Sequence, residues 1–158
     1  MVNDASAPRT IVFRYQPTRI SLLSTPPALK PTVVLADDND EIVKTVTRLL
    51  RPDFAVIGTA PNGREAMSLA LELEPNLLVL DVAMPVLDGL QVCTLLKLTT
   101  LNTQVIFLTC FADAPMIEAA FRAGGRGVVF KSHMQAHLPI ALSEVLAGRT
   151  FLSTTEDQ

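Results

Sequence analysis

The sequence predicts an α/β fold, a doubly wound parallel sheet with helices on both faces, and three observations lead to this prediction. Short apolar runs alternate with amphipathic segments from residue 32 to residue 147. One of these runs, Leu77–Leu80, contains no polar side chain, which is typical of a strand buried on both faces in a parallel sheet. The connections between the segments are too short for anything except right-handed crossovers.

Five strands and five helices are expected in strict alternation. Each helix is expected where apolar residues recur every three or four positions, and four of the five end near a proline or a glycine. The expected strands are 32–36, 54–60, 77–81, 104–109 and 128–130, and the expected helices are 40–50, 65–73, 87–98, 113–124 and 135–147. This alternation favours the flavodoxin-like strand order 2-1-3-4-5.

Length and composition indicate one domain. The chain has 158 residues, of which 49% are hydrophobic and 18% charged, and this is enough to bury a sizeable core. We expect the domain at residues 32–148. Residues 1–31 contain five prolines and are expected to form a flexible N-terminal extension. Residues 149–158 are expected to be a C-terminal tail or a truncated linker.

The composition also excludes some classes of partner. No apolar run approaches the roughly 18 residues that span a bilayer, and the N-terminus lacks the layout of a secretory signal, so we expect a cytoplasmic protein that does not bind membranes. Residues 1–30 hold four basic residues and one acidic residue, so residues 31–158 carry −6 of a chain whose net charge is −3. Because phosphate contacts need clustered Lys and Arg, we expect no nucleic-acid binding by this chain.

The cysteines and histidines show no pattern of a metal site or a catalytic triad. Cys93 and Cys110 lack zinc-ligand spacing, and we interpret both as small buried residues. His133 and His137 have no partner at metal or triad spacing, so we assign both to the surface. Met84 is interpreted as a packing residue.

Polar or ionisable side chains follow four of the five expected strands. Asp37 and Asp38 follow the first, Asp81 ends the third, Thr109 ends the fourth and Lys131 follows the fifth. The predicted strand order has its switch point between the first and third strands, so the three carboxylates should converge there. Clustered carboxylates repel one another, and a hard divalent cation such as Mg²⁺ would neutralise them.

The spacing of the strands indicates what else the site holds. With about 4.8 Å between neighbouring strands, Thr109 lies one strand from Asp81, and Lys131 lies two strands, roughly 10 Å, away. The lysine side chain spans most of that gap, and a group of negative charge would fill the rest. A phosphoryl group on Asp81 fits, held by the cation, by Lys131 and by the Thr109 hydroxyl.

These residues carry a resemblance to a known family. Residues 32–152 resemble a response regulator receiver domain of the CheY-like superfamily, and the last part, residues 147–153, is similar to the segment that follows the receiver in LuxR/NarL-type regulators. The matching motifs, in chain order, are Asp37-Asp38, the D-x-x-M-P pattern of residues 81–85, Asp88-Gly89, Thr109 and the G-x-x-x-K pattern of residues 127–131.

The resemblance implies a two-component signalling function. It implies that Asp81 accepts a phosphoryl group from a histidine kinase or a histidine phosphotransfer protein. It also implies that Asp38, Asp81 and the main-chain carbonyl of Ala83 hold Mg²⁺, with Asp37 assisting through water. Lys131 would then bind the phosphoryl oxygens and Thr109 would sense them. A receiver of this kind is a phosphoacceptor with slow autodephosphorylation rather than an enzyme.

Two positions depart from the family pattern and concern the output of the signal. Val128 stands where many receivers carry an aromatic ring that swings inward on phosphorylation, and Ser132 replaces a frequent proline. We therefore expect a weakened switch at Thr109 and Val128. The resemblance implies contact with a downstream protein, or with a second copy of the chain, through the fourth expected helix, the fifth strand and the fifth helix.

Three alternatives stay open from the sequence. The chain could be the receiver of a LuxR/NarL-type transcription factor that has lost its helix-turn-helix domain, or a phosphorylation-independent pseudo-receiver that acts as an interaction module. A phosphatase of the haloacid dehalogenase type also phosphorylates an aspartate at a strand end. Its D-x-D-x-T motif carries a second acid, however, where this chain has Ala83.

Overall fold

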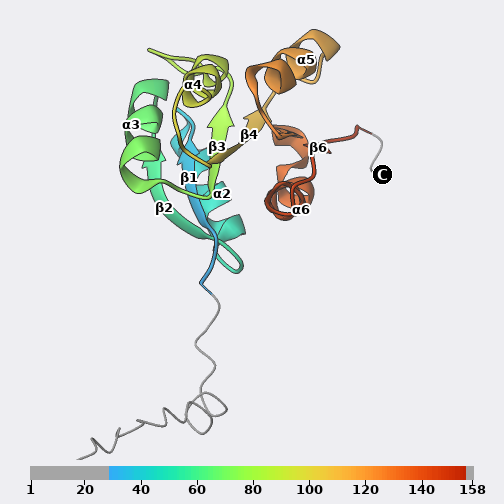
Figure 1. Cartoon of the computed structure of the whole chain (residues 1–158). Coiled ribbons are helices and arrows are strands. Elements are labelled where there is room, and N and C mark those ends of the chain that lie inside the picture. Colours follow the sequence, from blue (N-terminus) through green and yellow to red (C-terminus); the bar gives the residue numbers. More distant parts are fainter. Residues whose placement is uncertain (1–28, 156–158) are drawn as a thin grey trace, which may run out of the picture.

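The structure is a computed structural model that describes residues 29–155, and its centre is a six-stranded parallel sheet (Figure 1). The strand order is β2-β1-β3-β4-β5-β6, which confirms the predicted order of the first five strands and adds a sixth. The strands are β1 (Thr32–Ala36), β2 (Ala55–Ala60), β3 (Leu77–Asp81), β4 (Gln104–Thr109), β5 (Gly127–Phe130) and β6 (Phe151–Leu152).

Helices cover both faces of this sheet. Helices α3, α4 and α5 pack on one face and α2 and α6 on the other, so the molecule has three layers (Figure 1). The helices are α2 (Asp40–Leu50), α3 (Gly63–Leu73), α4 (Gly89–Leu96), α5 (Ala114–Ala123) and α6 (Met134–Leu146), and a short 3₁₀ helix, Lys131–His133, joins β5 to α6. No helix within residues 29–155 has both the length and the apolar character that crossing a membrane requires.

The central strands supply side chains to both layers of the core. Leu78 and Leu80 of β3 pack under α3, α4 and α5, whereas Leu77 and Val79 pack under α2 and α6. Successive side chains of a strand point to opposite faces, so a strand covered on both faces needs apolar residues at every position. This requirement explains why β3 carries the unbroken apolar run from which the fold was predicted.

Helix α4 is shorter than the predicted 87–98. It begins at Gly89 because Asp88 and Gln91 form a capping box: the Asp88 carboxylate accepts from Gln91 N at 2.8 Å, and the Gln91 side chain accepts from Asp88 N at 3.0 Å. At the other end Leu98 N donates to Leu95 O at 3.0 Å, a tighter turn that ends the helix. Leu98 is therefore 82% exposed.

The sixth strand lies beyond the predicted end of the domain at residue 148. Phe151 pairs with Gly127 and Leu152 with Val128 of β5, so the sheet continues into the segment expected to be a tail. Most of the predicted N-terminal extension and the last residues of the predicted tail, residues 1–28 and 156–158, lie outside the described residues.

Candidate functional site

Three carboxylates meet at the carboxyl edge of the sheet, as the strand order predicted. One oxygen from each of Asp37, Asp38 and Asp81 lies within 4.8 Å of the others. Asp37 is 2% exposed and Asp81 6% exposed, whereas Asp38 lies at the surface. The pairing of β1 with β3 explains the convergence, because Ala36 lies opposite Leu80 and the acids follow directly on both strands.

Lys131 closes the site by pairing with two of these carboxylates. Its Nζ lies 2.7 Å from Asp37 Oδ2 and 3.2 Å from Asp81 Oδ2. The sequence predicted that a gap would remain between Lys131 and Asp81 and that a negatively charged group would fill it. In the structure the ion pairs close this gap, because the long lysine side chain reaches the carboxylates directly.

The other oxygen of each buried carboxylate is fixed by its own turn. Asp37 Oδ1 accepts a hydrogen bond from Asn39 N at 2.8 Å, and Asp81 Oδ1 accepts one from Ala83 N at 3.3 Å. Asp37 Oδ2 is buried and, apart from its ion pair with Lys131, has no hydrogen-bond donor among residues 29–155. A buried carboxylate oxygen with unused lone pairs fits a site for a cation.

The buried charges shift the pKa values of the site. Burial raises the pKa of Asp81, the neighbouring Asp37 raises it further, and Lys131 offsets part of this increase. Burial by itself would lower the pKa of Lys131, but its bonds to Asp37 and Asp81 outweigh burial and raise it. The site holds three acids and one lysine. A divalent cation would balance the negative charge that the lysine leaves.

Thr109 lies at the same edge, as the last residue of β4. The residue is buried, and its hydroxyl oxygen accepts a hydrogen bond from Phe111 N at 3.0 Å. The hydroxyl thus stabilises the loop that follows β4 in this structure. The strand register places Thr109 opposite Phe130, the residue before Lys131, so one end of the sheet carries both side chains.

Gly89 allows the start of α4 to approach the site closely. A Cβ atom at residue 89 would lie 2.3 Å from the main-chain oxygen of Asp81, which is far inside van der Waals contact. Gly89 N also donates to Val82 O at 2.9 Å. A glycine is required here because the loop after Asp81 folds back against the helix.

Val128, the predicted switch position, is 1% exposed and packs in the core under α3, α4 and α5. Met84 is also buried in this core, which confirms its interpretation as a packing residue.

Two sequence interpretations were wrong. Cys110 is exposed, because β4 ends at Thr109 and the next residue leaves the sheet, whereas Cys93 is buried as predicted and burial raises its pKa to about 11. His137 is 6% exposed rather than on the surface. Residues 137, 141 and 145 share the apolar face of α6. This four-residue spacing is the sequence signal from which the burial of His137 could have been predicted.

This chain is similar to transcriptional regulatory proteins and to response regulators. The family model described as the response regulator receiver domain matches residues 33–143. The transcriptional regulatory protein LnrK of Bacillus subtilis is 35% identical over 118 residues, which cover 73% of this chain and 54% of LnrK. The nitrate/nitrite response regulator NarL of Escherichia coli is 30% identical over 124 residues, which cover 77% of this chain and 57% of NarL. The chain thus spans little more than half the length of these relatives.

A shorter relative and a solved structure agree with this result. The chemotaxis protein CheY of Halobacterium salinarum is 27% identical over 73% of this chain and 97% of CheY. The crystal structure of a LuxR-family two-component response regulator from Aurantimonas matches with a TM-score of 0.75 and 28% identity, over 79% of this chain and 91% of that one. Receiver domains are in general phosphoacceptors of two-component systems that bind Mg²⁺ at an acidic pocket. The matching family model, the strand order and the acidic edge lead to one conclusion: this chain belongs to the response regulator receiver domain family.

Proposed function

We propose that this chain accepts a phosphoryl group on Asp81 and passes the signal on by protein contact. The observation that carries the proposal is the position of Asp81, a buried carboxylate next to Asp37 and Asp38 and 3.2 Å from Lys131 Nζ. Among residues 29–155 this is the cluster of acidic and metal-ligating side chains close enough to share a cation.

The transfer step uses Asp81 as the nucleophile. A carboxylate oxygen of Asp81 attacks the phosphorus of a phosphohistidine, so a P–O bond forms while the P–N bond breaks and the imidazole leaves. The donor would be a histidine kinase or a histidine phosphotransfer protein. Lys131 would exchange its contact with the carboxylate for one with a phosphoryl oxygen, and the Thr109 hydroxyl would turn from Phe111 N towards the same group.

Mg²⁺ fits the residues present. Asp38, Asp81 and the main-chain carbonyl of Ala83 would hold the ion, and Asp37 would assist through water. When bound, the ion supplies positive charge that offsets the three acids and the incoming phosphoryl oxygens. Slow loss of the phosphoryl group to water would return the acceptor to its starting state, so we class the chain as a phosphoacceptor and not as an enzyme.

Adding Mg²⁺ is expected to raise the stability of the wild-type chain, because a ligand that binds the native state alone stabilises it by mass action. At ten times the dissociation constant the gain is roughly 1.4 kcal/mol. Thermal denaturation over a range of Mg²⁺ concentrations measures this gain. Asp38→Asn should lose most of it and, without metal, should be as stable as the wild type or more so, since one repelling charge is gone. A melting temperature indifferent to Mg²⁺ would refute the metal site.

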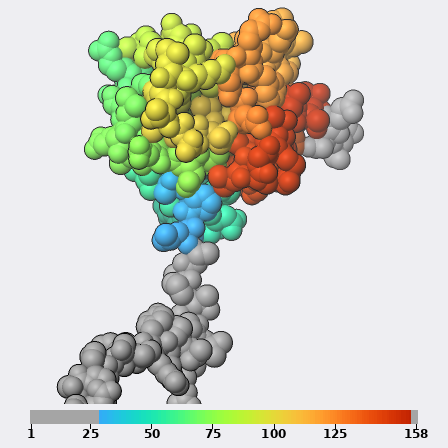
Figure 2. Space-filling model, in the orientation of Figure 1, coloured from blue at the N-terminus to red at the C-terminus, as the bar shows by residue number. Residues whose placement is uncertain are grey.

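We propose that the output surface is formed by α5, α6 and the edge of the sheet between them. Figure 2 shows the C-terminal segment, in red, beside α5, in orange, on one face of the molecule. β6 covers the outer edge of β5, so contact there would involve β6 instead of β5 itself. An open groove of about 310 Å³ runs from Ala112, in the loop after Thr109, to Ser153 after β6. This groove lies beside the loop after Thr109 and is open to solvent. Its position supports the use of this surface by a downstream protein or by a second copy of the chain.

The charge of the domain supports protein contact over other outputs. Residues 31–158 carry a net charge of −6, which repels nucleic-acid phosphates and anionic membranes. We therefore expect neither membrane nor nucleic-acid binding by this chain. We place the protein in the cytoplasm because response regulators typically act there. Tight DNA binding at physiological salt would contradict this part of the proposal.

Phosphorylation is expected to cause a small conformational change, because Val128 has no ring that can move between a buried and an exposed position. Amide NMR spectra with and without beryllofluoride measure the change. We expect shifts mainly in the loop after Thr109. Thr109→Val should remove these shifts and Thr109→Ser should keep them, since serine retains the hydroxyl. Large shifts across α5, β5 and α6 would contradict the weakened switch.

A further inference from the structure

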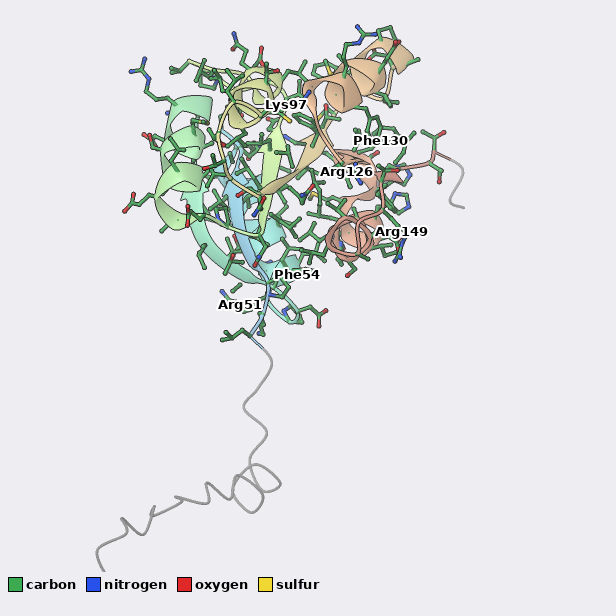
Figure 3. All side chains as sticks on the ribbon, viewed as in Figure 1. Arg51, Phe54, Lys97, Arg126, Phe130 and Arg149 are labelled. Carbon is green, nitrogen blue, oxygen red and sulfur yellow. The ribbon has the colours of Figure 1, made fainter. Side chains whose placement is uncertain are left out.

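The segment after β6 contributes a buried hydroxyl to the end of β5. Phe151 N donates to Arg126 O at 3.0 Å and Ser153 N donates to Val128 O at 2.9 Å, so the segment lies along the outer edge of β5. Ser153 is 3% exposed, and its Oγ accepts a hydrogen bond from Phe130 N at 3.1 Å. Figure 3 shows Phe130 beside this C-terminal strand.

Helix α6 holds the same hydroxyl from a second side. His137 Nδ1 lies 2.9 Å from Ser153 Oγ, and the His137 ring packs edge-on against Phe151 with 5.9 Å between ring centroids. A hydroxyl oxygen has two lone pairs, so Oγ can accept from Phe130 N whichever atom carries the hydrogen in the bond to His137. The position of Ser153 is thus set by α6 and β6 together.

Phe130 is the residue before Lys131, the cation of the site. One peptide unit separates them, which places their Cα atoms about 3.8 Å apart. On its inner side the end of β5 is held by pairing with β4, where Phe130 lies opposite Thr109. On its outer side the main-chain N–H of Phe130 has Ser153 Oγ as its acceptor. Loss of that acceptor would leave the outer side of the end of β5 unheld, and a movement there would shift the main chain of Lys131.

We propose that Ser153, oriented by His137, is a positioning residue that holds Lys131 at the distance needed to bind the phosphoryl group. The inference rests on the proposed function, because it assigns Lys131 to the phosphoryl oxygens. Ser153 lies outside residues 33–143, which the receiver family model matches. The segment that follows the matched residues would therefore help to position a residue of the phosphorylation site.

The proposal predicts a difference between anion binding and metal binding. β6 packs on β5 and α6, whereas the proposed Mg²⁺ ligands Asp38, Asp81 and Ala83 follow or end β1 and β3. A displaced Lys131 should weaken binding of a phosphoryl analogue without weakening the binding of Mg²⁺. General loosening of the fold would weaken both.

The test compares Ser153→Ala, Ser153→Thr and the control Thr154→Ala in the full chain. The dissociation constants of beryllofluoride, in saturating Mg²⁺, and of Mg²⁺ alone are measured by amide NMR titration. We expect Ser153→Ala to weaken beryllofluoride binding about three- to tenfold, part of the loss expected for one hydrogen bond to a charged group. Its Mg²⁺ affinity should be no lower than that of the wild type. Ser153→Thr, which keeps the hydroxyl, should recover most of the loss, and Thr154→Ala, which changes an exposed neighbour, should match the wild type.

A second measurement reads the contact itself. Amide hydrogen exchange at Phe130 should be faster in Ser153→Ala than in the wild type or Ser153→Thr. Unchanged beryllofluoride affinity in Ser153→Ala, an equal weakening of Mg²⁺ binding, or an equal loss in Ser153→Thr would each overturn the inference and leave the proposed function intact. A wild-type chain that neither binds beryllofluoride nor is phosphorylated would overturn the proposed function, and this inference with it.

Discussion

Asp81→Asn is expected to abolish covalent phosphorylation by acetyl phosphate in the presence of Mg²⁺. The carboxylate of Asp81 is the nucleophile of the proposed reaction, and an amide cannot form the acyl phosphate. Intact-protein mass spectrometry should show one added phosphoryl group on the wild type and none on the variant. The same experiment separates a phosphoaccepting receiver from a phosphorylation-independent pseudo-receiver, because the latter would show no label on either protein.

The variant is expected to fold, so that loss of label reports chemistry. Burial and the neighbouring Asp37 raise the pKa of Asp81. Because the pKa is raised in the folded state, the protonated carboxyl group contributes to the stability of the fold. This contribution to stability is fully present below the ordinary pKa of 3.8 and is lost as the pH rises through the raised pKa. At neutral pH the ionised form is therefore a cost of folding that asparagine removes. Asp53→Asn, at an exposed position after α2, is the matched control and should be labelled like the wild type. Equal labelling of Asp81→Asn would refute the assignment.

Lys131→Gln is expected to cause a large loss of stability in metal-free buffer. The lysine is the partner of two buried carboxylates, and removing one partner of a buried ion pair costs about 3 kcal/mol or more because the remaining charges are left unpaired. Urea denaturation at neutral pH measures the loss. The raised pKa of Lys131 means that its contribution is fully present below 10.5, the ordinary pKa of lysine, and fades as the pH rises through the raised value.

Mg²⁺ should restore much of the stability of Lys131→Gln, because the ion replaces the lost positive charge next to the same acids. The gain from Mg²⁺ should therefore be larger in the variant than in the wild type. Phosphorylation should stay impaired, since Mg²⁺ does not replace the contact between Lys131 and a phosphoryl oxygen. Lys44→Gln is the control, because the Lys44 side chain is 67% exposed and its pair with Glu41 lies on the surface. A variant as stable as the wild type without metal would contradict the ion pairs.

The predicted strand order and acidic edge depended on features that sequence patterns record directly. A strand buried on both faces must be apolar at every position, so β3 could be identified from Leu77–Leu80 alone. Parallel strands end at the same edge, and the acids after β1 and β3 therefore had to meet once the order was given. Asp37, Asp38 and Asp81 were predicted from these two facts without any distance.

Other features depended on contacts between distant residues, which no local pattern records. The sequence placed Lys131 two strands from Asp81. Whether its side chain would reach the carboxylates depended on how the strands and side chains pack at this edge of the sheet. The strand β6 has two residues, too few to show a period, and it forms because the outer edge of β5 offers unpaired main-chain groups.

The environment of His137 shows the same division. The helical pattern was readable, and residue 137 shares a face with Ala141 and Val145, but a histidine is polar enough to lie on the surface. Its burial became favourable when β6 brought Ser153 within 2.9 Å of Nδ1, sixteen positions away in the chain. The sequence by itself determined the strands and the acids at their ends, because local apolar runs mark both, and the alternation of strands with helices favoured the strand order that brings these acids together. Tertiary structure decided the ion pairs of Lys131, the burial of His137 and the position of Ser153, because each needs a partner that the chain supplies from elsewhere.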